Sequence, residues 1–191
     1  MRQIIVTLAT LLLAACASFF TATGTGQVTI KDRITVTTTT PWNRYDASAT
    51  EFSEMWTADG LPLDNLWFYT GIPDGEPLKR TYDSRQKKLP KFQTSMTPTE
   101  VVEMIESYMT ADGSTFKLER LTPTPLAGSA GFRFDFRALR KTDEVDLRGV
   151  GFATIHREKL YMMIYTAPAT YYFHKNLTRI EAMAASLTIK Q

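Results

Sequence analysis

Strict alternation of apolar and polar side chains marks residues 131–139. Phe132, Phe134 and Phe136 occupy one set of positions, and Arg133 and Asp135 fall between them. Because successive side chains of a strand point to opposite faces, this order predicts a strand with one apolar and one charged face. Turn-like stretches follow at residues 141–142 and 157–158, so residues 131–166 are expected to form two consecutive hairpins around which the chain is organised.

A turn at residues 141–142 sets the register of the first hairpin. Antiparallel pairing then places Arg137 opposite Asp146 and Asp135 opposite Arg148, so that opposite charges meet. Such ion pairs on an open sheet face contribute at most ~1 kcal/mol and are common, so we interpret them as structural. A catalytic or anion-binding cluster is the alternative. The apolar partners in this register are Phe136 with Leu147 and Phe134 with Gly149.

The second turn keeps the apolar face continuous over all three strands. Along the middle strand this face carries almost no side chains, because it consists of Gly149, Gly151 and Ala153. A closely packed helix, or the rings of the preceding strand, must fill the space. The expected pairs are Ile155 with Leu160, Ala153 with Met162, and Gly151 with Ile164.

Composition narrows the class of protein. The chain has 191 residues, of which 43% are hydrophobic and 22% charged, which suits one globular domain. The net charge is +2, and it falls by one if Arg2 is removed with a signal peptide. This charge is too small to indicate nucleic-acid binding, so no nucleic acid is expected as a partner. The single cysteine excludes an intramolecular disulfide and a cysteine-rich metal site.

The amino terminus reads as a bacterial lipoprotein signal. A basic start precedes an apolar run at residues 4–15, which is too short to span a bilayer that needs ~20 residues. The run ends in Leu13-Ala14-Ala15-Cys16, the order of a lipobox, and contains the chain's only cysteine. We predict cleavage of residues 1–15 and lipidation of Cys16, where two or three acyl chains bind a membrane almost irreversibly. A plain secretory signal or an uncleaved anchor is the alternative.

By resemblance to lipoproteins of Gram-negative bacteria, Ala17 permits transfer to the outer membrane, so the protein is expected there, facing the periplasm. Residues 16–26 are small and polar beyond the cysteine and predict a flexible tether of at most ~33 Å for ten residues. Residues 27–191 are then expected to form a single globular α+β domain.

Further elements follow from local signals. Residues 28–40 predict one long strand or a hairpin bent near Lys31 and Asp32, and residues 51–57 and 63–70 predict paired strands around an Asp-Gly turn. Thr97, Pro98 and Glu100 form a capping box with proline at the first helical position, so a helix is expected from there to about residue 110. A strand over 115–121 and a helix over 169–186 complete an antiparallel sheet of about six or more strands flanked by two main helices.

Residues 79–91 carry six basic side chains and one acidic one. Arg85, Lys87, Lys88 and Lys91 are the candidates for contact with an anionic lipid surface or an acidic partner, since each basic residue contributes ~1 kcal/mol near such a surface. A solvated loop is the simpler interpretation, because the apolar residues in this run are too few for an amphipathic helix.

Motifs for catalysis are absent from the sequence. Ser129 misses a Gly-x-Ser-x-Gly elbow by one position and precedes a predicted strand, not a helix. His156 and His174 lack partners at metal-ligand spacing, and there is no phosphate-binding or dinucleotide-binding glycine loop. We therefore expect no enzyme, no metal and no cofactor.

Two short motifs carry a resemblance. Trp-Thr-x-Asp-Gly-x-x-Leu at 56–63 and Gly-Ile-x-Asp-Gly-Glu-x-Leu at 71–78, with the order of elements, resemble uncharacterised proteobacterial lipoproteins with a PsbP-like domain. The resemblance implies an α/β/α sandwich that acts as a non-catalytic binding or assembly module for an unknown envelope protein. A small-ligand or lipid binder with a cleft between sheet and helix is the alternative, on the basis of the many methionine and aromatic residues.

Overall fold

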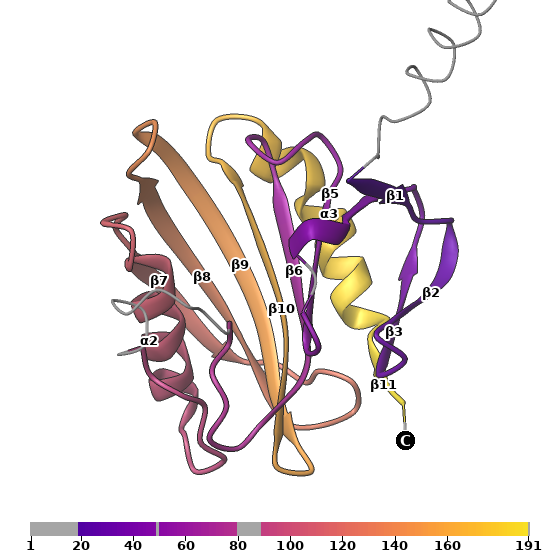
Figure 1. Cartoon of the computed structure of the whole chain (residues 1–191), viewed down its shortest axis with the longest axis vertical. Coiled ribbons are helices and arrows are strands. Elements are labelled where there is room, and N and C mark those ends of the chain that lie inside the picture. The colour runs from indigo at the N-terminus through magenta and orange to yellow at the C-terminus, as the bar shows by residue number, and fades with distance from the viewer. Residues whose placement is uncertain (1–18, 49, 80–88, 191) are drawn as a thin grey trace, which may run out of the picture.

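The computed structural model describes residues 19–48, 50–79 and 89–190. Within them, eight strands form an antiparallel sheet in the order β1-β4-β5-β6-β10-β9-β8-β7, and a small sheet has the order β11-β3-β2 (Figure 1). The strands are β1 (Phe20–Ala22), β2 (Gly26–Ile30), β3 (Ile34–Thr38), β4 (Asn43–Tyr45), β5 (Ser53–Thr57), β6 (Asn65–Pro73), β7 (Lys117–Pro123), β8 (Gly131–Arg140), β9 (Val145–His156), β10 (Lys159–Pro168) and β11 (Thr188–Ile189). The helices are η2 (Asp46–Ser48), α2 (Pro98–Met109) and α3 (Tyr172–Ala185).

The three central strands are the two predicted hairpins. Strands β9 and β10 pair in the predicted register, with Ile155 opposite Leu160 and Gly151 opposite Ile164. The register of β8 and β9 was predicted wrongly, by two residues: Arg137 lies opposite Arg148 and not opposite Asp146. The turn is longer than expected, because β8 ends at residue 140 and β9 begins at residue 145. A shift of two residues leaves each side chain on its predicted face.

Phenylalanine rings fill the space over the glycines of β9, as one of the two alternatives predicted. Phe136 lies opposite Gly149, and Phe134 lies opposite Gly151. A Cβ atom at Gly151 would lie 2.0 Å from Cζ of Phe134, and one at Gly149 would lie 2.1 Å from Cζ of Phe136. Only glycine leaves room for the tip of a phenylalanine ring over the strand at these positions.

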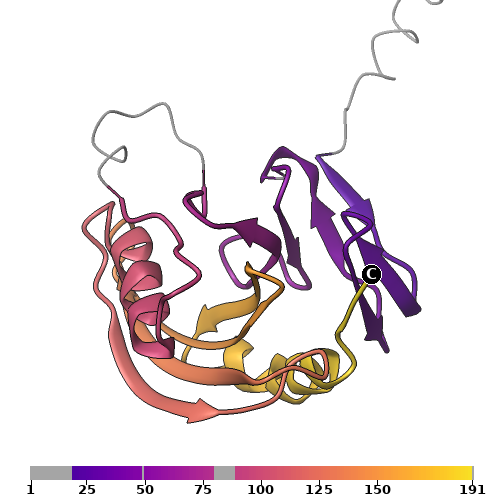
Figure 2. The ribbon, with the colours of Figure 1, turned by 90° about the horizontal axis from the view of Figure 1, so that it is seen from below.

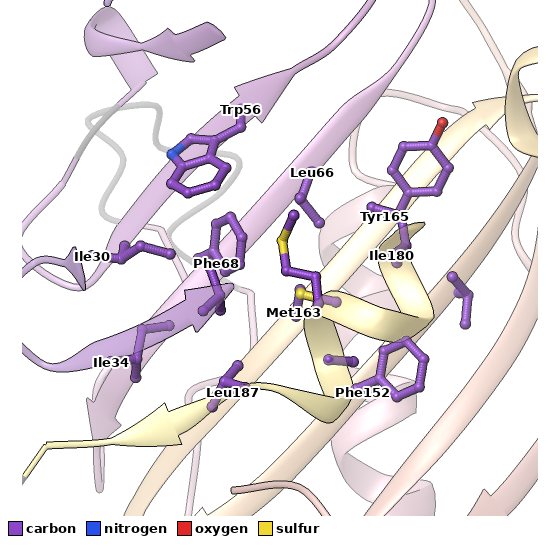
Figure 3. Close-up of a cluster of buried hydrophobic side chains, with 14 of the residues drawn as sticks. Ile30, Ile34, Trp56, Leu66, Phe68, Phe152, Met163, Tyr165, Ile180 and Leu187 are labelled. Carbon is purple, nitrogen blue, oxygen red and sulfur yellow. The ribbon is translucent and has the colours of Figure 1, made fainter. Parts of the chain in front are cut away.

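Both faces of the large sheet are covered. On one face α2 packs over a core that includes Phe134, Met162 and Ile105, and Figure 2 shows the sheet curving around this helix. On the other face α3 and the small sheet enclose a second core, in which Trp56, Phe68 and Met163 lie between residues of the small sheet and α3 (Figure 3). The predicted α+β architecture, with an antiparallel sheet between two main helices, is confirmed.

The sequence suggested that the charged face of β8 is open to solvent. In the structure this face is partly covered by α3. Arg133 binds Asp135 on its own strand through Nη2 at 2.7 Å and binds Glu181 of α3 through Nη1 at 2.6 Å. These hydrogen bonds raise the pKa of Arg133. The side chains of Arg133 and Asp135 are only 24% and 19% exposed. They fasten α3 to the sheet, so they have a structural role.

The two arginines that face each other across β8 and β9 share one carboxylate. Glu119 of β7 accepts from Arg137 at 2.9 Å and from Arg148 at 3.3 Å. Arg137 also lies 3.7 Å from Asp146, so that predicted ion pair forms, diagonally. The positive charges of these two arginines are therefore balanced by a carboxylate from a third strand, β7. The sequence pattern of the β8–β9 hairpin alone does not reveal this partner.

Local signals predicted the remaining elements well. Strands β2 and β3 form the hairpin that bends at Lys31 and Asp32, both with positive φ. Strands β5 and β6 pair as expected. Helix α2 begins at Pro98, and its capping box with Thr97 and Glu100 is complete. One boundary differs: β1 lies inside the predicted tether and pairs with β4, so the folded part begins before residue 27.

Glu100 is expected to make α2 sensitive to acid. Its carboxylate accepts from the backbone and side chain of Thr97 at 2.7 and 2.8 Å, and these bonds lower its pKa. A lowered pKa stabilises the fold above the unfolded pKa, ~4.3, and this contribution is lost as the pH falls through the folded pKa. Glu100→Gln should therefore lower the melting temperature at neutral pH, and the difference from wild type should shrink in acid.

Thermal melts from neutral pH down to about pH 3 check this expectation. Glu103→Gln, at an exposed site on the same helix, is the matched control and should follow wild type at every pH. A Glu100→Gln difference that stays constant over the whole range would contradict the role of the carboxylate.

Candidate functional site

A pocket of about 370 Å³ lies between α2 and the strands β5, β6 and β10. Aromatic and aliphatic side chains dominate its lining, and Lys79 is the one charged residue among the lining residues that the structure describes. Its size falls within the usual range for small-molecule sites. The lining residues are Ala47, Thr50, Ser53, Trp67, Tyr69, Leu78, Lys79, Ile105, Tyr108, Met109, Ile164 and Thr166.

The strand pattern explains why this pocket is apolar. Trp67 and Tyr69 alternate along β6 onto the same face, where their rings stack at 6.2 Å between centroids. Ile164 lies opposite Trp67 on β10 and faces the same side. Helix α2 adds Ile105 and Met109, one turn apart, from above.

Two tyrosine hydroxyls give the pocket polar character. Burial raises the pKa of Tyr69, and the nearby Tyr108 raises it further. Burial also raises the pKa of Tyr108. Both phenols therefore stay neutral at physiological pH and can donate a hydrogen bond. The hydroxyl of Tyr69 has no hydrogen-bond partner among the described residues, which leaves it available to a ligand.

Tyr108 also holds together the two ends of the basic segment. Its hydroxyl donates to the carbonyl oxygen of Pro90 at 2.9 Å and accepts from the amide of Leu78 at 3.2 Å. Nearby, the backbone of Gly75 donates to Phe92 at 2.8 Å. The base of the segment is thus fixed against α2 at the edge of the pocket.

The predicted contact residues of the basic segment are only partly described. Arg85, Lys87 and Lys88 lie outside the described residues, whereas Lys91 is described and exposed. Lys79 lines the pocket and is exposed, so it lies at the rim. The structure thus brings the start of the basic segment and the pocket together, which sequence patterns alone did not show.

Cys16 also lies outside the described residues. The described chain begins at residue 19, where the carbonyl oxygen of Phe19 accepts from the amide of Asp46 at 3.0 Å. Asp46 starts η2, and Ala47 in the same short helix lines the pocket. The start of the described chain is therefore hydrogen-bonded to the short helix that contributes to the pocket.

The second turn and a distant loop form a pair that the sequence did not reveal. Oγ of Ser129 lies 3.0 Å from Nδ1 of His156, 27 residues away. Among the described residues, no carboxylate binds the other nitrogen of this ring to orient it, as a nucleophile and base would need. His156, Arg157, Lys159 and Lys190 line a second, more basic hollow of about 350 Å³ beside this pair.

Asp59 of the first motif and Asp64, which directly follows it, form a structural network and not a catalytic pair. Asp64, 1% exposed, accepts from Thr57 at 2.6 Å and from the amides of residues 58 and 59. Asp59 binds Lys175 and Asn176 of α3. The motif at 56–63 therefore shapes the β5–β6 connection and joins it to α3. Sequence spacing hid this role because the partners are more than 110 residues away.

Two absences are confined to the described ranges. Within 19–48, 50–79 and 89–190 no group of three or more histidine, cysteine, aspartate or glutamate residues is placed to hold a metal ion. In the same ranges no helix is both long and apolar enough to cross a membrane.

Comparison with known proteins identifies the fold. No protein-family model matches the chain, and no curated protein does. The solution structure of cyanobacterial PsbP (CyanoP) from Synechocystis sp. PCC 6803 matches with a TM-score of 0.57 and 14% identity, over 92% of this chain and 95% of that chain. The chain has the PsbP fold. This confirms the architecture that the sequence resemblance implied.

A second solved structure matches less well. The crystal structure of PA94 from Pseudomonas aeruginosa, described as a protein of unknown function and putative regulator, gives a TM-score of 0.46 and 13% identity. It covers 87% of this chain and 95% of the other. At these identities the likeness shows the fold alone. The described residues of the PsbP-like domain present no evident catalytic site.

Proposed function

We propose that the protein is a bacterial lipoprotein whose PsbP-like domain is a non-catalytic binding or assembly module. Residues 1–15 are removed, and Cys16 carries the lipid that holds the domain at the outer membrane, facing the periplasm. The lipobox at residues 13–16, completed by the chain's only cysteine, supports the anchor. The partner that this hypothesis implies is an envelope protein.

The pocket beneath α2 is the observation that carries a binding role. Its walls are largely apolar, and the polar side chains of its described lining residues are hydroxyls and one lysine at the rim. The carboxylates of β7 and β8, which acid–base chemistry would need, are engaged by arginines. This chemistry suits recognition of an apolar group without turnover.

A small-ligand or lipid binder is the second candidate, and the same pocket favours it. Its position between sheet and helix is the one that the sequence interpretation gave for such a cleft. The two candidates differ in what is expected to co-purify with the protein. The assembly module should co-purify with another protein, and the ligand binder should co-purify with a lipid or other small molecule.

Extraction of the full-length lipoprotein from membranes in mild detergent separates the candidates. A protein recovered at a fixed stoichiometry after crosslinking supports the assembly module. A lipid that co-purifies at one molecule per chain, without such a protein, supports the ligand binder. Turnover of any recovered ligand would contradict both.

The basic segment is expected to contribute to association but not to folding. Changing Arg85, Lys87, Lys88 and Lys91 to glutamine should leave the melting temperature unchanged, since a polar run broken by Pro90 adds little to a core. Each removed charge weakens attraction to an anionic surface by ~1 kcal/mol at low salt.

Vesicle co-sedimentation of the full chain with Cys16→Ser, with and without the four changes, measures this effect. Binding to anionic vesicles should fall in the fourfold variant and depend less on salt. Four exposed lysines elsewhere, changed to glutamine, give a charge-matched control: Lys117, Lys141, Lys159 and Lys190. Equal binding of the fourfold variant and its parent at low salt would contradict a role in association and would support the interpretation of the segment as a solvated loop.

A further inference from the structure

The start of the described chain lies near the pocket. Phe19 is hydrogen-bonded to Asp46, one residue before Ala47 at the pocket. Only two residues separate Cys16 from Phe19, so three Cα–Cα steps span at most ~11 Å. The tether is thus shorter than the ten residues predicted, because β1 is paired with β4. An acylated Cys16 would hold this side of the domain at the bilayer surface.

Basic and aromatic residues lie on the same side of the domain. Figure 2 shows the described amino-terminal end and both ends of the basic segment on the open side of the curved sheet. Phe19 and Phe20 are 63% and 37% exposed there, and Phe20 packs against Tyr45 at 5.2 Å between ring centroids. Exposed aromatic rings favour the membrane interface. The side that carries the pocket rim is therefore apolar and basic at once.

From this geometry we infer that the pocket beneath α2 binds one acyl chain of an anionic phospholipid of the membrane that holds the protein. The chain lies against Trp67, Ile164 and Met109, and the hydroxyl of Tyr69 meets the ester. Lys79 at the rim pairs with the phosphate. This inference rests on the proposed lipoprotein anchor and names the ligand of the same site.

The chemistry of the lining selects this class of ligand. An acyl chain needs apolar, adaptable walls, which methionine and aromatic side chains provide. An anionic head group needs a cation and no carboxylate, and among the described lining residues Lys79 is the one charged group. A polar cofactor would leave its groups unpaired against Ile105 and Ile164.

Photo-crosslinking in bilayer nanodiscs tests the inference. The mature lipoprotein is placed in phosphatidylcholine nanodiscs that contain phosphatidylglycerol with a diazirine in its acyl chain, and adducts are mapped by mass spectrometry. Adducts are expected on pocket residues of β6, β10 and α2. Ala47→Trp fills the rim and should reduce them about tenfold, whereas Ala185→Trp, exposed on α3, should not.

A second variant keeps the test independent of pocket shape. Lys79→Glu should reduce adducts from phosphatidylglycerol more strongly than adducts from phosphatidylcholine carrying the same diazirine, because the choline cation offsets the phosphate charge of the second lipid. Lys190→Glu is its control. Adducts confined to Phe19 and Phe20, or unaffected by Ala47→Trp, would overturn the inference and leave surface contact alone.

Two other sources of an acyl chain are separated in the same way. Diazirine fatty acid, supplied free to the full chain with Cys16→Ser, tests a fatty acid. The same probe, incorporated by cells into the wild-type anchor, tests the protein's own lipid. Pocket adducts from either source, with none from nanodisc phosphatidylglycerol, would refute the phospholipid assignment. Acylation of Cys16 is read from intact mass, so failure of the anchor is recognised separately.

Discussion

Replacing Phe134 with alanine is expected to lower the free energy of unfolding by about 3–5 kcal/mol. The ring is fully buried on the α2 face of β8, packs over Gly151 and stacks with Phe136 at 5.8 Å between centroids. Its removal leaves a cavity that Gly151 has no side chain to fill. Urea denaturation followed by circular dichroism measures the change.

An exposed residue of the same strand provides the control for Phe134. Leu139 is 42% exposed, so Leu139→Ala should change stability by no more than ~0.5 kcal/mol. A loss below about 1 kcal/mol for Phe134→Ala would contradict the packing described for this core.

A double-mutant cycle tests the contact itself. Gly151→Ala alone forces a Cβ atom to 2.0 Å from Cζ of Phe134 and should cost about 1–3 kcal/mol. In the Phe134→Ala background the same methyl group enters vacated space, so its cost should largely disappear. Gly24→Ala, where nothing lies within 4 Å, is the matched glycine control. Additive effects would show that ring and glycine do not interact.

Changing Cys16 to serine is expected to abolish lipid attachment completely. A hydroxyl cannot accept the diacylglyceryl group in place of the thiol, and the precursor is then not cleaved before residue 16. Each acyl methylene adds ~0.8 kcal/mol to membrane affinity, so loss of two or three chains removes the dominant attachment. Cells labelled with a fatty-acid probe should show a labelled wild-type protein and an unlabelled, larger Cys16→Ser precursor.

A neighbouring substitution controls for general effects on export. Ser18→Ala lies beyond the lipobox and should be labelled and processed like wild type. A labelled Cys16→Ser protein would place the lipid elsewhere on the chain and would end the lipoprotein hypothesis in its present form.

Features set by neighbours in the sequence were predictable. The capping box of Thr97 and Glu100 involves residues three apart, and the alternation of Phe132, Phe134 and Phe136 follows directly from strand geometry. Both predictions are confirmed. The packing of phenylalanine rings over the glycines of β9 was one of two predicted alternatives. It was predictable because glycines on a buried strand face leave space that a large side chain or a helix must fill.

Features set by distant residues were not predictable from the pattern. The register of β8 and β9 depends on turn length, and Glu119 of β7 supplies the charge that lets Arg137 face Arg148. The predicted charged face of β8 was open because its partner Glu181 of α3, which binds Arg133, lies 48 residues away in the sequence. The pocket joins η2, β6, β10 and α2, so it exists only once these elements pack together.

The intact mass of the wild-type protein extracted from cell membranes tests the proposed anchor most directly. The expected species begins at Cys16, lacks residues 1–15, and carries a diacylglyceryl group on the thiol with an added acyl chain on the freed amine. A protein that retains residues 1–15, or that begins at another residue with Cys16 unmodified, would contradict the anchor and with it the membrane-facing pocket.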